Sequence, residues 1–82
     1  MFGTVSEATA HPREILRPVI TRGAHGFILI HNHPSGDPTP SEVDLAMTKE
    51  IQKGCKYLGL TLHDHIIVGG GQELSLRGLG KM

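Results

Sequence analysis

Histidine is the residue type best suited to do chemistry in this chain, because four of its six histidines form two closely spaced pairs. His31 and His33 follow one apolar run, and His63 and His65 precede another. Alternate side chains of a β-strand point to the same face, so two histidines two residues apart can reach one metal ion. Ligands also bind at the carboxyl ends of strands in open α/β sheets. The pair His31 and His33 is therefore a candidate metal site.

Asp44, in the first turn of the next expected helix, could supply a third ligand. Two imidazoles and one carboxylate leave a fourth tetrahedral position open, as in catalytic zinc sites, where zinc lowers the pKa of bound water to about 7. A simpler interpretation stays open, because Ser41 and Asp44 have the S-x-x-D spacing of a capping box. Most His-x-His pairs on strands also do not bind a metal ion.

The other reactive residues are expected to be structural. His63 and His65 lack a third ligand at a useful spacing, so we expect them to form hydrogen bonds in the core or on a sheet face. Cys55 lies on the apolar stripe of a helix, where a free cysteine acts as a small hydrophobe. A zinc deaminase would need the H-x-E and P-C-x-x-C motifs, and this sequence has neither.

Two helices are predicted from apolar periodicity. Pro12 suits the first turn of the shorter helix, and Pro18 should kink or break it. The buried stripe expected there is Ile15, Leu16, Val19 and Ile20. The longer helix should start at Ser41 and end at Gly59. Its expected buried stripe is Val43, Met47, Ile51, Cys55 and Leu58.

Strands are expected at residues 3–10, 26–31, 60–68 and 72–76, with a glycine hairpin between the last two. Residues 26–31 are apolar at successive positions, as in a sheet covered by helices on each side. The element order predicts one α/β domain over residues 1–82, with a small mixed sheet flanked by helices.

Composition limits the function. Eight basic and eight acidic residues give zero net charge, which disfavours direct binding to nucleic acid. The single cysteine cannot form an internal disulfide, and no apolar run is long enough to span a membrane. We expect a cytoplasmic protein that does not bind membranes.

The segment HNHPSGDPTPSEVD at residues 31–44 resembles the JAMM (MPN+/JAB) metalloprotease signature, H-x-H-P-x₆-S-x₂-D. The chain closely resembles the bacterial RadC family in three segments: the residues of this motif, the PRE at residues 12–14 and the DHIIVG at residues 64–69. The resemblance covers nearly the whole chain. It implies the JAB/MPN fold, which is related in its α-β-α architecture to the cytidine deaminases.

The resemblance also implies roles for individual residues. His31, His33 and Asp44 match the zinc ligands of the family, and Ser41 matches the serine that helps to hold the oxyanion. The activity implied is hydrolysis of an amide or peptide bond by water activated on zinc. The substrate implied is a peptide or protein of unknown identity.

One catalytic group of the family has no match here. Its general base is a glutamate on a strand upstream of Gly3, and Glu7 and Glu14, the two acidic residues before His31, do not match that position. We therefore expect a metal-competent site with impaired hydrolysis. The alternative is a non-catalytic binding or assembly module associated with DNA repair. A missing upstream strand would also leave a sheet edge through which the chain could form a homo-oligomer.

Overall fold

The fold is a four-stranded sheet with two helices, and the computed structural model describes residues 2–6 and 11–82. The elements in chain order are β1 (Phe2–Ser6), α1 (Pro12–Thr21), β2 (Gly26–Asn32), α2 (Glu42–Leu58), β3 (Thr61–Gly69) and β4 (Gln72–Ser75). The sheet order is β1-β2-β3-β4, with the first three strands parallel and β4 antiparallel to β3. The predicted small mixed α/β sheet is confirmed, and residues 7–10 of the first expected strand lie outside the described residues.

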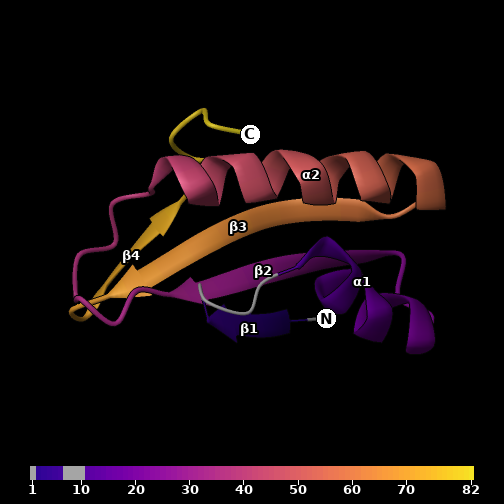
Figure 1. The fold of residues 1–82 in the computed structure, drawn as a ribbon, viewed down its shortest axis with the longest axis horizontal. Coiled ribbons are helices and arrows are strands. Elements are labelled where there is room, and N and C mark those ends of the chain that lie inside the picture. Colours follow the sequence, from indigo (N-terminus) through magenta and orange to yellow (C-terminus); the bar gives the residue numbers. More distant parts are fainter. Residues whose placement is uncertain (1, 7–10) are drawn as a thin grey trace.

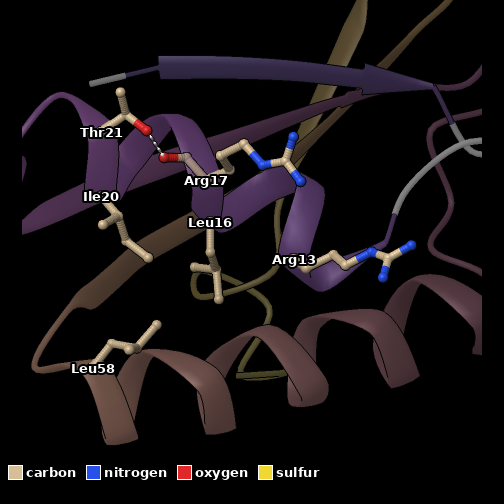
Figure 2. Close-up of a pocket in the computed structure, with 6 residues that line it drawn as sticks. All are labelled: Arg13, Leu16, Arg17, Ile20, Thr21 and Leu58. Carbon is tan, nitrogen blue, oxygen red and sulfur yellow. Dashed lines mark hydrogen bonds between the residues drawn. The ribbon is translucent and has the colours of Figure 1, made fainter.

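Both helices pack on the same face of the sheet. One core cluster combines Ile15, Leu16 and Val19 of α1 with Ile51 and Cys55 of α2 and with Phe27, Leu29 and Leu62 of the sheet. Figure 2 shows the two helices side by side, with Leu16 and Ile20 of α1 facing Leu58 of α2. The expectation of helices on both faces is therefore wrong for the described part of the chain. Leu29 is buried, while Ile28 and Ile30 on the other face of β2 are only partly buried.

The shorter helix begins where predicted, and of the two outcomes expected at Pro18, a kink or a break, the break does not occur. Pro12 lies at its first position, and α1 continues through Pro18 to Thr21. A ten-residue helix packed along its length can lose the single hydrogen bond to the Glu14 carbonyl without ending there. Ile20, expected to be buried, is 52 % exposed.

The longer helix begins and ends where its capping residues predict. Ser41 is the N-cap, and Gly59 ends the helix in the left-handed conformation at φ 70°. Its buried face differs from the prediction, because Val43 and Leu58 are exposed. The buried residues of α2 are Asp44, Thr48, Ile51 and Cys55. The first half of α2 therefore turns polar side chains toward the sheet.

The carboxyl ends of β2 and β3 meet the start of α2 at one end of the molecule, on the left of Figure 1. Parallel strands place their carboxyl ends at the same edge, and α2 must start near that edge to run back along the sheet. This arrangement brings together His31, near the end of β2, and Asp44, in the first turn of α2.

Candidate metal centre

His31, His33 and Asp44 form one buried cluster. Each offers a ligand atom, and these atoms all lie within 4.8 Å of one another. His31 Nδ1 is 3.1 Å from Asp44 Oδ1, and His33 Nε2 is 2.9 Å from Asp44 Oδ2. The two imidazole rings meet edge to face with centroids 4.9 Å apart. The structure thus brings together the three residues that the sequence singled out.

His33 is held by the backbone on both sides. Its N–H donates to the Val68 carbonyl at 2.8 Å, and its own carbonyl accepts the Gly36 N–H at 3.0 Å. The turn at Gly36 presses against the β3–β4 hairpin, since a Cβ on Gly70 would lie 2.5 Å from the Gly36 oxygen. This close backbone contact fixes the loop that follows β2, and with it His33.

The hydrogen bonds of His33 fit a site for a cation. Its Nδ1 lies 2.8 Å from the Asp37 carbonyl oxygen, and a carbonyl can only accept, so Nδ1 carries the hydrogen. In the neutral ring Nε2 then has a lone pair, which faces a carboxylate oxygen at 2.9 Å. Two acceptors at that distance need a proton or a metal ion between them. A carbonyl that holds the second nitrogen of a ligating histidine is also the usual support for such a ligand.

Asp44 combines two tasks. Its Oδ2 accepts the Ser41 N–H at 2.7 Å, while the Asp44 N–H donates to Ser41 Oγ at 3.1 Å, which completes the capping box. Burial works to raise the pKa of this carboxyl, but the hydrogen bonds with Ser41 and the two imidazoles prevail and lower it. The N-terminal end of the helix dipole favours the ionised form as well. The capping and metal-ligand interpretations of Asp44 are therefore compatible.

Two further buried polar residues, His65 and Thr48, contact the cluster; we call them the buried polar layer. The His65 ring stacks on His31 with centroids 5.6 Å apart and planes 18° apart, and its Nδ1 lies 2.6 Å from Thr48 Oγ1. Burial lowers the pKa of His65 to about 4, and the neighbouring His31 adds to this effect, so the ring is neutral at pH 7. The hydrogen bond expected for His65 is present, and its partner is Thr48 of α2. Thr48 was missed, and its only signal in the sequence is its position one helical turn after Asp44.

The other candidates lie apart from the cluster. His63 is exposed, and Cys55 is buried in the core, as expected for a small hydrophobe. Glu14 is exposed on α1, and Glu7 lies outside the described residues. Ser41 is partly buried at the helix cap beside Asp44.

Access to the cluster is from the His33 side. His31 and Asp44 are fully buried, whereas His33 keeps 8 % of its surface exposed. Asn32, between the two histidines, lines an open hollow together with Val68, Glu73 and the turn between β3 and β4. None of His31, His33 and Asp44 lines this hollow, so it lies near the cluster in the chain without opening onto it.

A buried His₂Asp set at the carboxyl ends of parallel strands, capped by a helix, defines a small α/β domain with a candidate metal centre of three protein ligands. The family model described as "RadC-like JAB domain" matches residues 1–81, and the chain belongs to this family.

Relatives agree with this assignment. The chain is 50 % identical over 78 residues to a UPF0758 protein of Rhodobacter capsulatus, and 51 % identical over 78 residues to one of Ruegeria pomeroyi. These alignments cover 95 % of this chain but 36 % and 35 % of the two relatives. The chain thus spans about a third of the length of the curated relatives it matches. Neither described helix is long and apolar enough to cross a lipid bilayer.

Proposed function

We propose that this domain is a zinc-dependent hydrolase that cleaves amide bonds in a peptide or protein. The observation that carries the proposal is the cluster of His31, His33 and Asp44, which offers three ligands of the types that zinc prefers. A closed structural site would have four protein ligands. Among the described residues the cluster has three, which leaves a position for a reacting molecule.

Zinc held by these residues would supply Lewis acidity and a water molecule of lowered pKa. The protein residues would bind and orient. Asp44 brings the negative charge that offsets part of the cation, and the Asp37 carbonyl keeps His33 in the orientation needed for ligation through Nε2. These contacts hold the ligands in place before the metal binds, which reduces the ordering required on binding.

Ser41 is proposed to stabilise the oxyanion that forms when an amide carbonyl is attacked. Its Oγ accepts the Asp44 N–H, and a hydroxyl that accepts this bond still has its own hydrogen to donate. A donor aimed at developing negative charge typically contributes about 10²–10³ in rate. Its capping bond and its proposed catalytic bond can coexist.

The described residues supply no separate proton acceptor to the cluster. Among the described acidic residues, Asp44 alone belongs to the cluster, and it serves there as a ligand. Without a carboxylate to take the proton and pass it to the leaving amine, hydrolysis should be slower by about 10²–10⁴. We therefore propose that these 82 residues bind metal well and hydrolyse poorly.

The test is metal analysis of the protein purified without added zinc, followed by assay with a fluorogenic peptide library. We expect one equivalent of zinc, little hydrolysis, and a gain of hydrolysis when an upstream strand bearing a glutamate is grafted on. Absence of zinc would refute the proposal and leave Ser41 and Asp44 as helix caps. A grafted protein that binds zinc and stays inert would instead favour the non-catalytic binding module.

A further inference from the structure

The Thr48 hydroxyl joins the buried polar layer to the metal cluster. Thr48 Oγ1 lies 2.8 Å from the Asp44 carbonyl oxygen and 2.6 Å from His65 Nδ1. Thr48 is 1 % exposed and His65 is fully buried, so water does not compete for these bonds. The hydroxyl thus links the first turn of α2, which carries Asp44, to strand β3.

The direction of both bonds follows from the donors available. A carbonyl oxygen only accepts, so the single hydrogen of the Thr48 hydroxyl goes to Asp44. The hydroxyl must then accept from His65, whose Nδ1 carries the hydrogen. This argument holds whatever the charge of the ring, and in the neutral ring it selects one of the two tautomers.

A purely structural role does not account for this choice of residues. Among the described residues, His65 Nε2 is buried without a hydrogen-bond partner, which an apolar side chain of similar size would avoid. The apolar stripe predicted for α2 also gives way to a polar one here, since Val43 is 65 % exposed while Asp44 and Thr48 are buried. Asp44 is itself a member of the metal cluster, and Thr48 is bonded to its carbonyl group.

We propose that Thr48 and His65 are positioning residues for the metal cluster. The Thr48 hydroxyl fixes the orientation and the tautomer of the His65 ring. That ring stacks on His31 and so fixes the plane of the first ligand. The same hydroxyl holds the backbone of Asp44, so one side chain sets the spacing between two of the three ligands. This inference rests on the proposed metal site.

The test compares Thr48→Val, which keeps the shape and removes the hydroxyl, with Thr48→Ser, which keeps the hydroxyl. Thr21→Val is the matched control, because the Thr21 hydroxyl makes the same bond to the carbonyl four residues back, Arg17 at 2.8 Å (Figure 2), on an exposed part of α1. His65→Phe is a second variant, which keeps a stacking ring without a nitrogen to be held.

Two readouts are needed. Nitrogen-15 NMR of the metal-free protein reports the tautomer of His65, and competition with a chelator reports the zinc Kd. In Thr48→Val the His65 hydrogen should move from Nδ1 toward Nε2, and the zinc Kd should rise about 10–100-fold, as for other residues that support a ligand. His65→Phe should raise the Kd similarly. Thr48→Ser and Thr21→Val should match the wild type in both readouts.

An unchanged His65 tautomer in Thr48→Val would overturn the hydrogen-bond assignment. The positioning role would be overturned if the His65 tautomer changed in Thr48→Val while the zinc affinity stayed unchanged in both Thr48→Val and His65→Phe. Zinc binding by the wild type would in that case leave the proposed function standing. A wild-type protein that binds no zinc would overturn the proposed function and the positioning role together. The tautomer measurement would still decide the Thr48–His65 bond.

Discussion

The two histidine pairs have the same spacing, one at the carboxyl end of β2 and the other within the neighbouring parallel strand β3, yet they have different surroundings. His31 and His33 are both buried and face Asp44 together. His65 is fully buried, whereas His63 is exposed. Only the first pair therefore gives two imidazoles that can reach one ion.

The difference comes from a bulge in the pairing of β2 with β3. Phe27 pairs with Leu62 but Ile28 pairs with Asp64, so His63 is an extra residue without a partner on β2. A bulge restarts the alternation of side chains along a strand. Leu62 and His65 are then buried on one side although they are three residues apart. A two-residue spacing predicts a shared face only where the strand is regular.

The carbonyl groups at the bulge are bonded by the end of the chain. The Arg77 side chain donates to the carbonyls of His63 and Leu62 at 2.5 Å and 3.3 Å. The Arg77 N–H also donates to Asp64 Oδ1 at 3.1 Å. These bonds connect the irregular segment of β3 to the turn that follows β4.

The largest effect is expected when Asp44, the carboxylate that the first pair faces, is changed. Asp44→Asn removes the carboxylate charge but keeps an oxygen that can accept the Ser41 N–H, so the helix cap should survive. Loss of a direct ligand should raise the zinc Kd by more than the 10–100-fold typical of supporting residues. Isothermal titration with zinc, with circular dichroism to check helix content, measures this.

His63→Ala is the control for that experiment. It belongs to the second pair and lies outside the cluster, so its zinc affinity should equal that of the wild type. A loss of zinc in His63→Ala as large as in Asp44→Asn would break the distinction between the two pairs.

The next effect concerns the loop that places His33. Gly70 has φ +56°, and its Cβ would lie 2.5 Å from the Gly36 oxygen, whereas Gly71 has φ +75° and open space around it. Gly71→Ala should cost about 1–2 kcal/mol from backbone strain alone. Gly70→Ala adds a clash and should cost about 2–4 kcal/mol. Urea denaturation measures both, and equal losses would show that the contact with Gly36 does not matter.

A smaller effect separates the two members of the second pair. His65→Ala removes a fully buried ring and should lower the free energy of unfolding by about 2 kcal/mol. His63→Ala, at an exposed position, should change it by less than about 0.5 kcal/mol. Denaturant midpoints of both variants provide the comparison, and similar losses would contradict the different burial of the two rings.

The smallest effect on stability is expected at Asp64, the residue between His63 and His65 in the sequence. Burial raises the pKa of Asp64, but hydrogen bonds from Ser75, Arg77 and His65 outweigh it and lower the pKa below its usual value. A lowered pKa in the folded state adds stability at neutral pH, which is lost as the pH falls through that pKa. Asp64→Asn should therefore be less stable by about 1 kcal/mol at pH 7 and equal to the wild type in strong acid. A difference that does not change with pH would contradict this linkage.

Much of the fold could be predicted because its signals are local. Pro12, Ser41 and Gly59 mark helix ends by their own backbone preferences. The cluster that could hold a metal ion could also be predicted, because His31, His33 and Asp44 lie in one short segment with a specific family motif.

The rest depends on contacts between distant segments. The bulge at His63 arises from pairing with β2, and the neighbouring residues give no sequence signal that predicts it. The buried face of α2 was placed on Val43 because apolar periodicity treats Asp44 and Thr48 as surface residues. Their burial is favourable only because His31, His33 and His65 supply partners from other elements. Polar clusters of this kind reverse the usual inference from hydrophobicity to burial.

The shared use of Asp44 Oδ2 has a consequence for dynamics. The oxygen that faces His33 also accepts the N–H of Ser41, the N-cap of α2, so the site and the helix end cannot loosen independently. A ligand that binds only the folded form raises the free energy needed for local opening. Amide hydrogens in the first turn of α2 should exchange with solvent more slowly when the site is filled. The amide exchange rates at the start of α2 therefore report whether the site is filled.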